Sequence, residues 1–197
     1  MANRAKKTVI VQTAQEWNAL DSDVSMVFVK SYSCNDPSLM VLNVSRLTSL
    51  QELSIGDYCF ENVKELRLVG LSGLKRVTIG SNSFTKSKNG FGNDPNRRFQ
   101  LKDCFALTEL RVGRYSFSDY SVCEIENVDA LESIAMGELN SESFNFHSAS
   151  LELKSGIGAF WLCLDFPTLK SLLFGSEVMT NCDRAVFESV CLVHVIE

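Results

Sequence analysis

The sequence predicts a mostly β fold built from stacked repeats, with an α+β segment at its N-terminus. Two observations predict it. A pattern of the form L-x-x-L-x-I-G-x-x-[SC]-F recurs along the chain, and a shorter pattern, L-x-L-x-x-L, falls between its copies. A segment repeated in this way cannot bury its apolar edge alone, so successive copies are expected to stack on one another.

The longer pattern is anchored by five leucines whose spacing indicates the fold class. The separations between successive anchors are 24, 33, 24 and 38 positions, and the anchors are Leu50, Leu74, Leu107, Leu131 and Leu169. A basic period of 24 lies within the range of leucine-rich repeats, about 20 to 29 residues, and the excesses mark two insertions. The predicted fold class is therefore a leucine-rich-repeat solenoid with about five irregular repeats and a small N-terminal cap.

The N-terminal segment does not match the repeat. Residues 8–12 and 24–30 have the β-branched and aromatic content of strands, and between them Thr13 and Glu16 have the spacing of a helix capping box, with Trp17 on one face of the helix that follows. Because the apolar end of a stack must be covered, we interpret this segment as a cap.

The expected division is therefore a tail and αβ cap over residues 1–38, followed by one continuous repeat domain over residues 39–197. Its length of 197 residues, with 45% apolar and 22% charged residues, suits a single core.

Each repeat is expected to contribute two extended segments whose alternate residues point inward. A glycine that needs a positive φ or a close approach of the next repeat follows the first segment of each. A phenylalanine at the end of the pattern would stack from repeat to repeat, at Phe60, Phe84, Phe117 and Phe144.

Composition argues against several functions. A net charge of −5 and a pI near 5.2 lack the basic footprint that nucleic acid or an anionic membrane surface requires. No apolar run is long enough for a membrane helix, and the first residues do not form a signal peptide, so an intracellular, cytoplasmic location is expected. The seven cysteines contain no C-x-x-C pair, and neither His147 nor His194 lies in a nucleophile motif. We expect no enzyme activity, no metal and no cofactor.

Three stretches, at residues 55–60, 79–84 and 112–117, resemble the I-G-x-x-[AS]-F signature of leucine-rich-repeat proteins of the BspA-like type, which are found in bacteria and protists. The resemblance covers about residues 39–179. It implies a surface-adhesion or protein-recognition module without catalytic residues in its repeats. The chain lacks the regular Pro and Cys positions of the bacterial form and carries two long insertions, which favours a scaffold role over adhesion.

Two sets of residues are candidates for binding a protein partner. Outward positions on the first segment of each repeat form a ladder, and flat strand ladders are the usual binding surface of stacked repeats; the residues are Glu52, Arg76, Thr78, Glu109 and Arg111. The first insertion concentrates basic residues around an aromatic one, at Lys86, Lys88, Phe91, Arg97 and Arg98. The alternative for the ladder is an ordinary solvated strand face, and the alternative for the insertion is a solvated, mobile loop; neither would bind a partner.

The C-terminal region breaks the repeat. Residues 186–196 are an apolar run, either a last capping strand or an edge that pairs with another copy, and the second insertion, residues 156–167, is strongly apolar. The sequence thus predicts a non-catalytic protein-interaction module with an unidentified protein partner. The alternative is a structural or adhesive protein that forms homo-oligomers through its C-terminal edge.

Overall fold

A computed structural model describes residues 6–87, 92–154 and 169–188 of the chain. The described residues form thirteen strands and one short helix, in the order β1 (Thr8–Val11), α1 (Ala14–Asn18), β2 (Met26–Val29), β3 (Val41–Asn43), β4 (Glu52–Ile55), β5 (Glu65–Val69), β6 (Arg76–Ile79), β7 (Asp94–Lys102), β8 (Glu109–Val112), β9 (Tyr120–Glu126), β10 (Ser133–Met136), β11 (Ser150–Lys154), β12 (Ser171–Phe174) and β13 (Ala185–Glu188).

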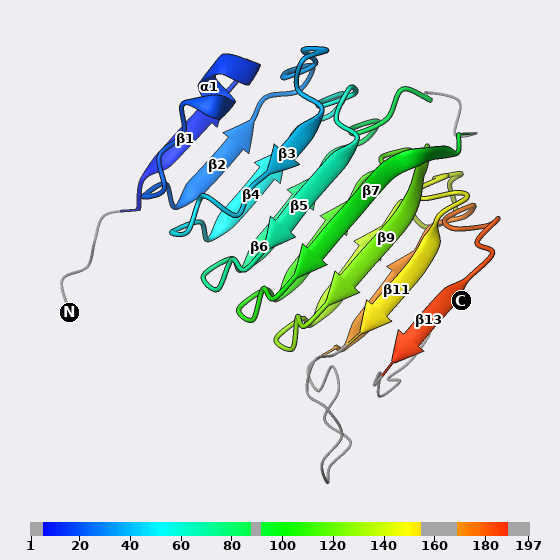
Figure 1. The fold of residues 1–197 in the computed structure, drawn as a ribbon. Coiled ribbons are helices and arrows are strands. Elements are labelled where there is room, and N and C mark those ends of the chain that lie inside the picture. Colours follow the sequence, from blue (N-terminus) through cyan, green and yellow to red (C-terminus); the bar gives the residue numbers. More distant parts are fainter. Residues whose placement is uncertain (1–5, 88–91, 155–168, 189–197) are drawn as a thin grey trace, which may run out of the picture.

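The strands form two parallel sheets that lie face to face (Figure 1). One has seven strands in the order β1-β2-β4-β6-β8-β10-β12, and the other has six in the order β13-β11-β9-β7-β5-β3. From β3 onward, each strand along the chain joins the sheet opposite to its predecessor. Neighbours in a sheet are therefore two strands apart in sequence.

The core lies between the sheets and is made by alternate residues of both. In the seven-stranded sheet Leu53, Val77 and Leu110 are paired across neighbouring strands and fully buried. In the six-stranded sheet Leu66 and Phe99 occupy the equivalent inward positions. Burial of each such side chain contributes about 1.5 to 3 kcal/mol, which offsets the entropy lost when the chain is ordered.

The prediction of a leucine-rich-repeat solenoid is wrong, although the expectation of mostly β structure agrees with the strand content. A leucine-rich repeat contributes one strand and a helix or 3₁₀ segment that line a horseshoe. Here the second segment of each pair is also a strand, and these strands form a sheet of their own. The only helix among the described residues is α1, with five residues. A two-sheet parallel β architecture replaces the predicted class.

The N-terminal strands and helix occur where the sequence predicts them. The hydroxyl of Thr13 accepts a hydrogen bond from the Glu16 N–H at 3.1 Å, and the Glu16 carboxylate accepts one from the Thr13 N–H at 3.2 Å, which confirms the capping box. Trp17 is buried and packs edge-on against Phe60, with ring centroids 5.6 Å apart. β1 pairs with β2, and β2 pairs with β4, so both strands continue the seven-stranded sheet.

Close approach explains the recurring glycine of the longer pattern. A Cβ on Gly80 would lie 2.4 Å from Asp57 Oδ1 and 2.6 Å from the Gly56 carbonyl carbon, and neither Gly80 nor Gly56 has a positive φ. No side chain fits in this space without displacing the neighbouring backbone. Of the two explanations expected from the sequence, the close approach is therefore the correct one at this position.

The predicted aromatic stack forms, with one member different. Phe60 stacks on Phe84 at 5.1 Å, and Phe84 stacks on Phe117 at 4.8 Å. The next ring is Phe146, 4.8 Å from Phe117, and not Phe144, which stacks on Tyr115 at 5.7 Å. The stretched fourth copy of the pattern places its inward phenylalanine two residues later than the expected position.

The Ser or Cys of the pattern links successive segments through a buried hydrogen bond. Ser83 Oγ donates to the Gly56 carbonyl at 2.8 Å, and Ser116 Oγ donates to the Gly80 carbonyl at 2.6 Å. In the stretched copy Asn145 takes this role, with Nδ2 donating to the Gly113 carbonyl at 2.6 Å. The polar residue is selected because a buried carbonyl without a partner is costly.

Within the ranges that the structure describes, no helix combines the length and the apolar character needed to cross a membrane.

Candidate interaction surfaces

The outer face of the seven-stranded sheet brings five of the predicted binding residues together. Glu52, Arg76 and Glu109 are in register on neighbouring strands, and Thr78 is in register with Arg111 in the parallel row. The side chains of Arg76 and Arg111 are 55% and 64% exposed. Arg76 lies 3.9 Å from the Glu52 carboxylate, and Arg111 Nε donates to Glu109 on its own strand.

This outer face is hollowed toward its β12 end. The hollow has a volume of about 430 Å³, and its lining includes Thr78, Arg111, Ala135, Leu139 and Leu173. Ala135 pairs with Arg111 on one side and with Leu173 on the other, so a small side chain lies between two long ones. Leu139, in the loop after β10, is 51% exposed. The result is a concave apolar floor with a guanidinium at its rim.

The outer face of the six-stranded sheet has a different electrostatic character, because its charges compensate one another. Lys102 lies between two carboxylates, 3.0 Å from Glu124 and 3.2 Å from Glu126. Glu124 also accepts a hydrogen bond from Gln100 at 2.8 Å. Burial acts to raise the pKa of Glu124, but the bonds from Gln100 and Lys102 outweigh it and lower the pKa below the usual value. Further along, Glu152 is bridged by Lys154 at 3.1 Å and Arg184 at 3.4 Å.

The basic insertion is only partly a surface feature. Lys86 and Arg98 are exposed, and Lys88 and Phe91 lie outside the described residues. Arg97, expected in a binding loop, is instead 2% exposed, which corrects its assignment. The signal was present in the sequence: Arg97 has the same strand parity as the inward residue Phe99, so alternation directs its side chain into the core.

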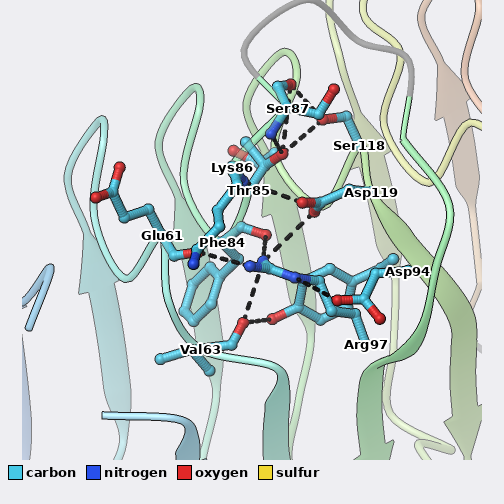
Figure 2. A network of polar contacts seen from close by, with 12 residues as sticks. Glu61, Val63, Phe84, Thr85, Lys86, Ser87, Asp94, Arg97, Ser118 and Asp119 are labelled. Carbon is cyan, nitrogen blue, oxygen red and sulfur yellow. Dashed lines mark hydrogen bonds and ion pairs between the residues drawn. The ribbon is translucent and has the colours of Figure 1, made fainter. Parts of the chain in front are cut away.

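Arg97 is held by backbone carbonyls and carboxylates from several loops (Figure 2). Its Nη2 donates to the Glu61 carbonyl at 2.9 Å, and its Nη1 donates to the carbonyls of Val63 and Phe84, both at 3.3 Å. Nη1 also lies 3.5 Å from Asp119 Oδ1, while Nε lies 3.6 Å from an oxygen of Asp94. The arrangement satisfies a buried cation, two buried carbonyls and one partly buried carbonyl at once, as a structural anchor requires.

Asp119 closes the same network on the other side of the insertion. Its Oδ2 accepts a hydrogen bond from the Lys86 N–H at 3.0 Å, while its Oδ1 faces Arg97. A Cβ on Gly92 would lie 2.4 Å from the Asp119 Cβ, so the returning chain passes directly over this residue. Asp119 thus holds both ends of the inserted segment. Nothing in the sequence around Asp119 indicated this role.

A stacked pair of tyrosines, one exposed and one partly buried, has no counterpart among the residues predicted from the sequence. Tyr32 and Tyr58 stack with centroids 4.8 Å apart and an interplanar angle of 6°, and Tyr32 is 73% exposed. Both have a positive φ, and they occupy equivalent turns after β2 and β4. Stacking compensates for part of the backbone strain and leaves an aromatic edge beside the outer face.

The reactive side chains of the described residues are placed for structure. Burial raises the pKa of the Cys34 thiol to about 12 and that of Cys104 to about 11, which keeps both protonated and poorly nucleophilic at neutral pH. His147 is 6% exposed, and its Nε2 lies 2.9 Å from Asn181 Nδ2. The described part of the chain contains no cluster of His, Cys, Asp and Glu that could hold a metal ion.

No family model, curated protein or solved structure matches this chain. The resemblance to BspA-like proteins therefore stays a prediction, and the functional argument depends on the chain's own surfaces.

Proposed function

We propose that this chain is a non-catalytic protein-binding module that contacts its partner through the outer face of the seven-stranded sheet. The observation that carries the proposal is the difference between the two outer faces. On the six-stranded sheet, Lys102 and Glu152 are each bridged by two partners of opposite charge, so binding there would have to desolvate a compensated network. On the seven-stranded sheet, Arg76 and Arg111 each face a single carboxylate and are more than half exposed, and Arg111 lines the hollow.

The chemistry of this face suits a protein better than other partners. It combines exposed arginines, each beside one carboxylate, with an apolar hollow, and interfaces between proteins typically surround an apolar centre with a polar rim that includes arginine. The net charge of −5 disfavours nucleic acid. As part of the same proposal we place the protein inside the cell, since the thiols of Cys34, Cys59, Cys104 and Cys123 are free. Imaging of the tagged full chain tests that location.

Site-specific photo-cross-linking tests which face binds. A benzophenone amino acid replaces Thr78 on the seven-stranded sheet or, as the matched control, Gln100 on the six-stranded sheet. In an extract of the cells that produce the protein, we expect a discrete adduct from position 78 that disappears with Arg111→Glu and persists with Arg98→Glu. Equal adducts from both faces, or an adduct indifferent to Arg111→Glu, would exclude the proposal.

The described residues also favour a second candidate, self-association through the end of the seven-stranded sheet. In β12 the core-facing Leu172 and Phe174 are only partly buried, whereas Ile134 and Met136 at the equivalent positions of β10 are 2% and 1% exposed. Within the ranges that the structure describes, no strand pairs with the outer edge of β12, and an edge strand is a site for pairing with another chain. Most of the apolar run predicted as the contact, residues 186–196, lies outside the described residues. Light scattering across a range of concentrations decides the matter, because a monomer at every concentration rules self-association out.

A further inference from the structure

The hollow on the seven-stranded sheet has features that define the chemistry of its occupant. Its backbone is already paired on both sides, since β8 and β10 are interior strands of the sheet. A partner therefore cannot add as a further strand at this place and must bind through side chains. The hollow has a volume of about 430 Å³ and is wide open to solvent, so an occupant would lie on it and not inside it.

The rim of the hollow favours an occupant with a negatively charged group. Arg111 uses Nε to bond Glu109, and within the described residues no hydrogen bond or ion pair to its two terminal nitrogens is found. A guanidinium presents its donors as a planar fork that matches a carboxylate. The other charged pair at this end, Arg114 and Glu138, is 3.9 Å apart and already matched. Arg111 is thus the group with capacity left for an incoming carboxylate.

The floor of the hollow favours an occupant with an aliphatic side chain. Ala135 leaves space between its register neighbours Arg111 and Leu173, and the half-exposed Leu139 forms a wall. Filling this space removes apolar surface of Leu139 and Leu173 from water, which is the main favourable term in such contacts. Neighbouring strands are about 4.8 Å apart, and side chains on one face of an extended peptide are about 7 Å apart. Arg111 and Ala135 are direct register partners, about one strand spacing apart, and residues two positions apart are the nearest pair on one face of a crossing peptide, so such a pair is the best match to this separation.

From this geometry we propose that the hollow binds an extended peptide segment of the partner in which an Asp or Glu lies two residues from a Leu, Ile or Val. The carboxylate pairs with the Arg111 guanidinium, and the aliphatic side chain packs on Ala135 between Leu139 and Leu173. This inference depends on the proposed function, and it adds the class of sequence that the binding face recognises.

Selection from a library of random eight-residue peptides displayed on phage tests the inference directly. The full chain is the bait, and Ala135→Trp, which fills the hollow, is the counter-selection. We expect enrichment of the spacing of an acidic residue and an aliphatic residue two positions apart. For a synthetic peptide from the selection, we expect affinity to fall about tenfold or more with Arg111→Gln and when the peptide's carboxylate becomes an amide, as for loss of one charge-assisted bond.

The matched control is Val122→Trp, a half-buried position on the outer face of the six-stranded sheet, which should leave affinity unchanged. Circular dichroism confirms that each variant is folded. Selected peptides without an acidic position, binding that survives Ala135→Trp, or no retained peptide would each overturn the inference. If binding survives Ala135→Trp but is lost with Arg76→Glu, the proposed face stands and only the assigned occupant fails.

Discussion

Replacing Arg97 by methionine isolates the contribution of the buried cation at the base of the insertion. Methionine keeps much of the side-chain length and removes the charge and all the donors. The variant leaves Asp119, which is 6% exposed, without its buried positive partner, and it removes a donor from the carbonyls of Glu61 and Phe84. Val63 keeps one bond, because the Tyr120 hydroxyl donates to its carbonyl at 2.7 Å.

The expected loss of stability is large relative to the whole. Removing one partner of a buried ion pair costs about 3 to 5 kcal/mol, and a folded domain has a free energy of unfolding of about 5 to 15 kcal/mol. With a urea dependence of about 2 kcal/mol per molar, Arg97→Met should lower the unfolding midpoint by about 2 M. The double variant with Asp119→Asn should be less destabilised than the two single effects added together, because the isolated charge is gone.

Urea unfolding followed by circular dichroism measures these changes. Arg98→Met is the control, because Arg98 is the exposed neighbour on the same strand, and its substitution should change stability by no more than about 0.5 kcal/mol. If Arg97→Met and Arg98→Met were equally stable, Arg97 would not be a buried anchor. Its original assignment to a binding surface would then be preferred.

Three further predictions concern the core, pH dependence and thiols. Phe117→Ala should cost about 3 to 5 kcal/mol in urea unfolding, whereas Phe105→Ala, at a position 54% exposed, should change little. Because folding lowers the pKa of Glu124, its carboxylate stabilises the folded state at pH values above the pKa of the unfolded chain, and this stabilisation is lost as the pH falls through the pKa of the folded state. The difference in unfolding free energy between wild type and Glu124→Gln should therefore shrink from pH 7 to pH 3. A difference that stays constant over this range would contradict the assignment. Maleimide labelling at pH 8, read by peptide mass spectrometry, should reach Cys182, which is partly exposed, well before Cys104, whose burial raises its pKa to about 11.

Pairing between strands could be predicted from sequence because it follows directly from the spacing of apolar residues. Leu53 pairs with Val77, 24 positions later, and Val77 pairs with Leu110, 33 positions later, which are the separations of the anchor leucines. The fold class was not predictable in the same way. The spacing specifies which segments lie side by side, and the alternation in the shorter segment correctly indicated a second strand; the error lay in assigning this two-strand unit to the leucine-rich-repeat class.

Errors in the predicted details come from insertions, where position within the pattern stops being informative. In the fourth copy Phe146 lies 15 positions after Leu131, whereas Phe60 lies 10 positions after Leu50; the five added residues place Phe146 in the stack and Phe144 beside Tyr115. Only part of the lining of the hollow could be predicted from the sequence, for a related reason. Ala135 and Leu173 are outward positions of the pattern, but Leu139 belongs to the stretched loop and has no equivalent in the other copies.

The insertion before β7 shows why added length can require a buried charge. The regular segments satisfy their carbonyls through the Ser or Cys of the pattern, as Ser83 does for Gly56. The pattern's bond persists across the insertion, where Ser116 donates to Gly80, and the insertion adds Arg97, one long side chain with enough donors to serve the carbonyls of Glu61 and Phe84 as well. Because Arg97 and Asp119 are committed to holding this base, basic residues in the insertion are weak indicators of a binding loop. Exposed arginines on a continuous strand face, such as Arg111, are better ones.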